Sequence, residues 1–209
     1  MSNCVACLIL LSSLAYAKAD QTTRKEQNSN TAVSQEQVCD ELAAQQTLDS
    51  ELIRVALADF LSRDDLVDSL AKEKPKEFAV VHSRSAGATY TFHSESESTD
   101  WKLPNGVRRD FEQRNAKRWY VAFLKLGEHA VVDNLDKNPP DQFGKSLFKN
   151  HSGAKAYVHV WLPGYSPDKT HALVSFYFGP TPHGARATYW LIKENGRWKV
   201  KESSFAFYA

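Results

Sequence analysis

The sequence is poor in cysteine, balanced in charge and without a long apolar segment. Of its three cysteines, Cys4 and Cys7 lie within the first 17 residues. The 26 Lys and Arg against 25 Asp and Glu leave a formal charge of +1, so no general field attracts nucleic acid or an acidic membrane. No run reaches the ~18 uninterrupted apolar residues of a membrane span. These absences exclude a strongly basic nucleic-acid binder and a helical membrane protein.

The composition is that of a folded protein. Hydrophobic residues make up 42% of the chain and charged residues 24%, close to the values of ordinary globular proteins. If the first 17 residues are removed, Cys39 is the single cysteine left and an internal disulfide is impossible. The fold must then be held by its hydrophobic core alone.

The N-terminus carries the features of an export signal. An apolar run, Val5–Leu14, precedes the small-x-small pattern Ala15-Tyr16-Ala17, which is typical of a cleaved secretory signal peptide. We expect residues 1–17 to be removed and the protein to be exported, to the periplasm or the extracellular medium. A buried N-terminal helix and lipidation of Cys7 are the less favoured alternatives.

Residues 18–33 are almost wholly polar and offer little apolar surface to offset the entropy of ordering them. We expect a flexible tether there, followed by a single domain over residues 34–209.

Helical patterns open this domain. Ser34 begins a capping-box pattern for a first helix. An apolar stripe at helical spacing over residues 48–60 predicts a stronger helix, with Asp49 or Ser50 as its cap and an end near residues 62–65. Further helical segments are expected at 65–72, 106–115 and 142–148.

Strand patterns follow Pro75. Short β-rich segments lie at 78–82, 89–93, 119–126 and 130–132, with an acidic-serine loop at 94–100. The clearest signal is C-terminal, where four alternating runs cover 156–162, 171–178, 187–193 and 197–207. Asn195-Gly196 between the last two predicts a type I′ hairpin. The sequence thus predicts an α+β fold whose N-terminal helices pack on a curved antiparallel sheet ending in a four-strand meander.

The alternation of the meander divides its side chains between two faces. One face is apolar and should receive the helices, with Phe176, Tyr189, Leu191 and Trp198 in the core. The other is aromatic and polar, which suits stacking and hydrogen bonding to a ligand. The candidate binding residues on it are Tyr157, His159, Trp161, Ser175, Tyr177, Thr188 and Trp190. The favoured alternative is that residues 78–150 or a partner chain cover this face.

Other chemistries have weaker support. His159, His171 and His183 lack the spacing of a metal site, and there is no G-x-S-x-G or Gly-rich phosphate motif, so we expect no metal and no cofactor. The basic segment 108–118 includes acidic residues, so it is interpreted as a solvated helix face and not as a nucleic-acid site.

From Glu51 to the C-terminus, the order of features resembles a group of exported bacterial proteins of unknown function, over about three quarters of the chain. The matching pieces are residues 52–57, 78–81, 110–115, 164–174 and 189–200. Several of these proteins carry paired cysteines where this chain has Gly179–Gly184, so a role tied to those cysteines is not transferred. The resemblance implies a bacterial envelope setting and supplies no reaction.

A looser similarity in element order is to the α+β rolls of the cystatin and NTF2-like kind. Such folds host both enzymes and binding modules, so this similarity selects no function.

We therefore expect a non-catalytic binding or interaction module of the bacterial cell envelope. Its partner would be an envelope ligand or protein, and its oligomeric state is open. The alternative is a small hydrolase-like enzyme with His159 or His171 as general acid or base in a cleft on the same sheet.

Overall fold

The computed structural model describes residues 35–63, 78–87, 101–135, 149–179 and 185–207. The expected signal peptide and tether lie outside these ranges, and so do the segments expected at 65–72, 89–93, 94–100 and 142–148. The chain divides into two compact units, Met1–Gln45 and Gln46–Ala209. The described residues of the first unit are helical, and the second unit contains the sheet.

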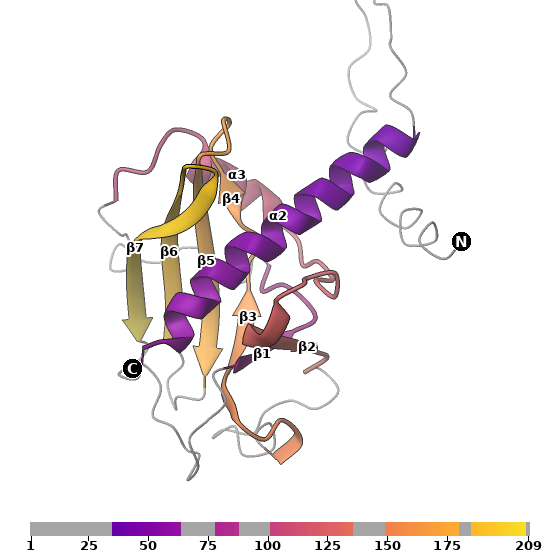
Figure 1. Ribbon diagram of the computed structural model, residues 1–209, viewed down its shortest axis with the longest axis vertical. Coiled ribbons are helices and arrows are strands. Elements are labelled where there is room, and N and C mark those ends of the chain that lie inside the picture. The colour runs from indigo at the N-terminus through magenta and orange to yellow at the C-terminus, as the bar shows by residue number, and fades with distance from the viewer. Residues whose placement is uncertain (1–34, 64–77, 88–100, 136–148, 180–184, 208–209) are drawn as a thin grey trace, which may run out of the picture. The chain divides into compact units, whose positions relative to one another are not determined.

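Helix α2 spans Gln35–Leu61. From Gln46 onward it lies across the sheet (Figure 1) and buries Leu52, Ala56 and Phe60 against it, as the stripe at 48–60 predicts. The ring of Phe60 packs 5.3 Å from that of Phe176, centroid to centroid. Helix and sheet therefore share one hydrophobic core.

The sequence pattern placed two helices here, and the structure has one. Residues 43–48 contain no glycine or proline to break the helix, so it continues through them. Asp49 and Ser50 are consequently inside the helix and cap nothing. Ser50 Oγ donates to the carbonyl of Gln46 and accepts from the backbone N–H of Lys125, while Asp49 makes the tertiary contacts described below.

Within the described residues the sheet has seven strands, and six of them run in the order β2-β1-β3-β5-β6-β7 with β4 paired to β5. Their bounds are β1 Phe78–His82, β2 Ala130–Asp133, β3 Ala154–Val160, β4 Gly164–Tyr165, β5 His171–Gly179, β6 Ala185–Glu194 and β7 Arg197–Phe207. The α+β class and the C-terminal meander are confirmed. Asn195 and Gly196 have φ of 51° and 76°, as a type I′ turn requires.

The sheet is mixed and not wholly antiparallel, because β1 pairs in parallel with both β2 and β3. Residues 119–126, expected as a strand, form an irregular segment in which the N–H of Leu124 bonds to the carbonyl of Val121. Tyr120 makes only an isolated bridge to Arg84 there. The strand patterns at 78–82 and 130–132 predicted β1 and β2, but such patterns carry no information on strand direction.

The second face of the sheet is covered at one end by helix α3, Val107–Arg114. This helix confirms the one predicted at 106–115, and it lies beside β4 (Figure 1). Its buried Val107 and Phe111 pack with Trp161 and Leu173 of the sheet. A Cβ added to Gly164 would collide with the backbone and side chain of Phe111, so the close approach of α3 to β4 requires glycine there.

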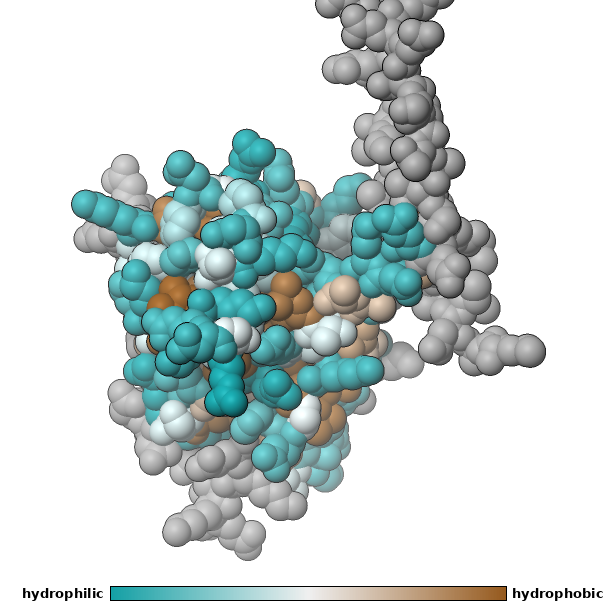
Figure 2. Space-filling model, turned by 45° about the horizontal axis from the view of Figure 1, so that its top comes forward, coloured by the Kyte–Doolittle hydropathy of each residue, from teal (hydrophilic) through white to brown (hydrophobic). Residues whose placement is uncertain are grey.

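The view in Figure 2 shows a mostly hydrophilic surface with small hydrophobic areas between polar ones. Among the described residues, the exposed large hydrophobic side chains are Tyr120 and Val131. In the described part of the chain, no helix is both long enough and apolar enough to cross a membrane.

Replacing Trp198 by Ala should lower the free energy of unfolding by about 3–5 kcal/mol, because the indole is 6% exposed within the main core. Urea unfolding followed by circular dichroism measures the change. Val131→Ala, at an exposed site, is the control and should change stability by less than about 0.5 kcal/mol. An unchanged midpoint in the Trp198 variant would refute the assignment of faces.

Candidate functional site

The second face carries a row of polar side chains that crosses five strands, which we call the transverse row. It consists of Asp133, His82, His159, Tyr177 and Arg186. The backbone register pairs His82 with Asp133, His159 with Tyr177 and Tyr177 with Arg186. The two parts of the row are joined by a contact between the rings of His82 and His159, whose centroids are 4.3 Å apart in an edge-on arrangement. Pairing between strands thus aligns residues that are scattered from position 82 to position 186.

His82 is fixed within this row by burial and by a backbone hydrogen bond. Its side chain is 3% exposed, and its Nδ1 accepts the N–H of Arg84 at 3.0 Å. A neutral imidazole that accepts at Nδ1 carries its proton on Nε2. The ring of His82 is therefore fixed in position, and the more exposed ring of His159 packs against it.

The β2 end of the row holds a carboxylate and histidine pair. His151 Nε2 lies 2.8 Å from Asp133 Oδ2, and both side chains are partly exposed. The hydrogen bond from His151 lowers the pKa of the Asp133 carboxyl, partial burial opposes this, and the Asn134 N–H and the nearby His82 add to the lowering. Asp133, the only carboxylate of the row, is thus already hydrogen-bonded to His151.

The β6 end holds a buried arginine. Arg186 is 4% exposed, its Nε donates to Ser175 Oγ at 2.8 Å, and its guanidinium lies 4.6 Å from the centre of the Trp161 ring. Ser175 Oγ in turn donates to the carbonyl of Ala187 and lies 3.1 Å from Thr188 Oγ1. Arg186 starts on β6 and Trp161 follows β3, so the side chain extends over β5 toward the middle of the sheet.

The seven residues predicted as a binding face fall into two groups. Trp161, Ser175, Thr188 and Trp190 are buried, whereas Tyr157, His159 and Tyr177 are partly exposed. Trp161 donates its indole N–H to the carbonyl of Gly87 and packs with the α3 residues. The face is therefore covered in part by Ala86, Val107 and Phe111. That the seven residues bind a ligand stays a prediction.

Trp190 is held by its neighbours on the same face. Its Nε1 donates to His171 Nδ1 at 3.1 Å, and the ammonium of Lys201 lies 3.7 Å from its ring centre. Both tryptophans that the sequence suggested as stacking platforms thus have a cation over the ring. Three members remain partly open to solvent, namely Tyr157, His159 and Tyr177.

Sequence reasoning missed His82, Asp133 and His151, and it left Arg186 on this face without a role. The alternation of Phe78, Val80 and His82 placed His82 on one face of a strand but could not identify the neighbouring strands. The neighbouring strands are determined by the parallel pairing of β1 with β2 and β3.

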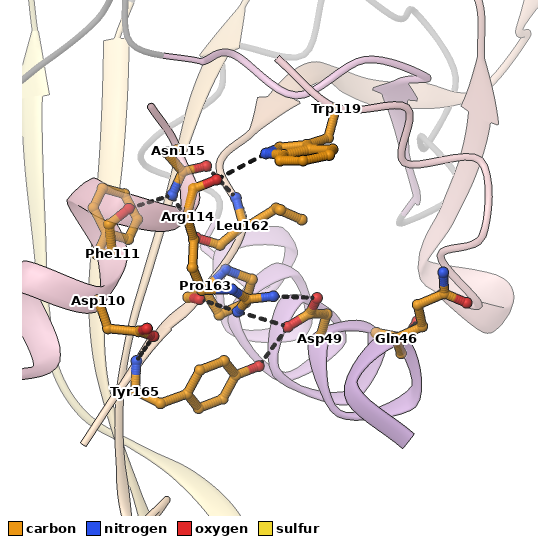
Figure 3. A network of polar contacts seen from close by, with 11 residues as sticks. Gln46, Asp49, Asp110, Phe111, Arg114, Asn115, Trp119, Leu162, Pro163 and Tyr165 are labelled. Carbon is orange, nitrogen blue, oxygen red and sulfur yellow. Dashed lines mark hydrogen bonds and ion pairs between the residues drawn. The ribbon is translucent and has the colours of Figure 1, made fainter. Parts of the chain in front are cut away.

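A second polar cluster, drawn in Figure 3, joins α2, α3 and the segment around β4. Arg114 forms two parallel hydrogen bonds to the Asp49 carboxylate, at 3.0 and 2.8 Å, and also donates to the carbonyl of Pro163. Tyr165 Oη donates to Asp49 Oδ1 at 2.6 Å. Asn115 donates to the carbonyls of Phe111 and Leu162 and accepts the N–H of Leu162. Each residue here is engaged with structural partners, so we assign the cluster to folding.

Burial and pairing set the ionisation of this cluster. Burial lowers the pKa of Arg114, but the hydrogen bonds and charge of Asp49 outweigh it and the net shift is upward. Burial, followed by the charge of Asp49, raises the pKa of Tyr165 far above its ordinary value. Arg114 is thus a cation and Tyr165 a neutral donor across the physiological range.

Two further observations concern metal binding and similarity to known proteins. Within the described ranges, no three His, Cys, Asp or Glu side chains converge in a way that would hold a metal ion. Comparison with protein-family models, with curated proteins and with solved structures found no match.

Asp49→Asn should destabilise the protein by about 3–5 kcal/mol, because it leaves the Arg114 charge buried without its carboxylate. The side chain of Asp49 is 2% exposed, so solvent cannot replace the lost partner. The control is Lys199→Met, which breaks the exposed pair with Glu194 and should cost less than about 1 kcal/mol. Equal losses in urea unfolding of the two variants would contradict the structural role of the buried pair.

Proposed function

We propose that the protein is an exported, non-catalytic binding module of the bacterial cell envelope that holds its ligand on the second face of the sheet. The transverse row is the observation that carries this proposal. In it, the partly exposed His159 and Tyr177 lie between the buried His82 and Arg186.

The arrangement favours binding for a physical reason. Side chains on rigid strands with buried neighbours lose little conformational freedom when a ligand arrives, and this raises affinity. His159 and Tyr177 stand on paired strands and are flanked by residues that burial holds in place. Imidazole and phenol groups supply hydrogen bonds, and the rings of Tyr157 and Tyr177, 6.5 Å apart, supply apolar area.

The enzyme alternative is supported by the contact between Asp133 and His151. A carboxylate that accepts a hydrogen bond from an imidazole orients the ring and stabilises its protonated form, as in acid–base catalysis. The pair lies on and beside the edge strand β2, and 19% of the His151 side chain and 39% of the Asp133 side chain are exposed. Such exposure weakens electrostatic effects, so this reading ranks below binding.

The binding proposal predicts that His159→Ala and Tyr177→Ala abolish capture of a defined glycan or peptide by the immobilised mature protein in array screening. These variants remove partly exposed groups, so urea unfolding should show a folded protein. His129→Ala, at a partly exposed histidine outside the row, is the matched control and should bind normally. Capture that survives both row variants, or no capture of any arrayed compound, would contradict the proposal.

The export proposal predicts that protein recovered from the native host starts at Lys18. The physical basis is the apolar run Val5–Leu14 followed by Ala15-Tyr16-Ala17. Intact-mass measurement of the extracytoplasmic fractions tests it. Exported protein that retains Met1 would refute cleavage, and protein confined to the cytoplasm would refute export.

A further inference from the structure

The two ends of the strand order differ in length. Within the described residues, β2 pairs with β1 alone and β7 pairs with β6 alone. Strand β2 has four residues, Ala130–Asp133, whereas β7 has eleven, Arg197–Phe207, and lies at one side of the sheet in Figure 1. The outer side of an edge strand presents backbone N–H and C=O groups that can pair with another strand. Strand β7 is therefore the long edge at which a strand can be added.

The first half of β7 has the features that protect an edge from such pairing. The side chains of Arg197, Lys199 and Lys201 are exposed. The register with β6 passes over Lys201, so a bulge lies there. Charged side chains, lysine above all, and bulges are the devices by which natural sheets keep other strands from their edges. Pairing is therefore disfavoured over residues 197–202.

The second half of β7, Ser203–Phe207, has none of these features. Its sequence carries no charge and no proline, and its register with β6 is regular. Residues 203–206 are partly exposed. The ring of Phe205 packs 6.5 Å from that of Phe178 and 5.9 Å from that of Tyr189, centroid to centroid, so the core holds this part of the strand. The second half is thus a fixed and uncharged edge.

The charge pattern along β7 determines which register two copies of this strand can adopt. Symmetric antiparallel pairing about Phe205 places the two 203–207 segments side by side and leaves the basic half of each copy outside the paired region. Pairing about Lys199 would instead place Arg197 opposite Lys201, and like charges opposite one another are destabilising. The edge is therefore complementary to itself over its uncharged half.

From this pattern we propose that β7 forms the interface of a homodimer, in which residues 203–207 of two copies pair antiparallel and join the two sheets. The same patch of each copy meets the other, as in most dimers with two-fold symmetry. Backbone hydrogen bonds between the two strands supply the attraction. A single strand pair makes an interface below the standard size of about 1,600 Å², so the dimer dissociates on dilution.

The symmetry of this dimer determines where its second faces lie. Antiparallel neighbours in one sheet are related by an axis perpendicular to the sheet, so the second faces of both copies lie on the same side. Two transverse rows on one side can hold a ligand with repeated units more tightly than one row can. This consequence rests on the proposed binding function, whereas the dimer itself does not.

Sedimentation equilibrium of the mature protein tests the dimer. A reducing agent prevents a disulfide between the Cys39 residues of two copies. A mass that rises with concentration from that of one chain toward that of two supports the proposal. The mass of one chain at every concentration up to about 1 mM would overturn it.

Substitutions at Ser204 locate the interface. Ser204 is partly exposed, and in pairing about Phe205 the two Ser204 side chains are diagonal neighbours within reach of long side chains. Ser204→Lys and Ser204→Glu should each weaken association about fivefold, because each places like charges near one another. An equimolar mixture of the two variants should associate more strongly than either alone, because opposite charges then meet.

The matched control is Val131→Lys, which adds the same charge to the exposed site on β2 and should associate like the native protein. Equal weakening in this control, or a mixture of the Ser204 variants that associates no more strongly than either alone, would contradict an interface at β7.

Amide hydrogen exchange of the native protein decides the question if urea unfolding shows that the Ser204 variants do not fold. Exchange at residues 203–207 should be slower at high protein concentration than at low, and exchange at residues 130–133 should not change. Exchange at 203–207 that is independent of concentration would overturn the proposal. None of these measurements involves a ligand, so their failure is distinguishable from failure of the proposed function.

Discussion

The buried ion pair between Asp49 and Arg114 connects the coverings of the two sheet faces. Asp49 belongs to α2, which packs on the apolar face, and Arg114 to α3, which packs on the other. Two charges in a poorly solvated place are stable only when their hydrogen bonds are satisfied, and Tyr165 and the Pro163 carbonyl provide the remaining partners. Because the geometry that satisfies them is narrow, the pair sets where α3 lies relative to α2 and β4.

Helix α3 covers one end of the second face. Val107 and Phe111 cover Trp161 and Leu173, so the end of the face near β4 is occupied by the protein's own side chains. Tyr177 of the transverse row packs against this same cluster, and the side chains of His159 and Tyr177 are partly exposed. The binding that we propose would use these two partly exposed side chains, whose neighbours His82 and Arg186 are buried.

The polar cluster around Asp49 and Arg114 and the transverse row differ in how exposed their side chains are. In the first, arginine meets a carboxylate at two points, and the carboxylate is buried. In the second, His159 and Tyr177 are partly exposed. We therefore assign the first to folding and propose the second as the place of the ligand.

The sequence by itself determined several local elements of this protein, because periodicity and turn chemistry act over a few residues. The stripe at 48–60, the Val107 and Phe111 spacing, and Asn195-Gly196 each specify a helix face or a turn without reference to distant residues. The meander and its core side chains, such as Tyr189 and Trp198, were predictable for the same reason. Only the tertiary structure decided which strands are neighbours and in which direction they run, since a strand pattern is the same for parallel and antiparallel pairing. The ring of His82 packs against that of His159, and Asp49 bonds to Arg114 instead of capping a helix. In both cases long-range pairing and burial outweigh local preference.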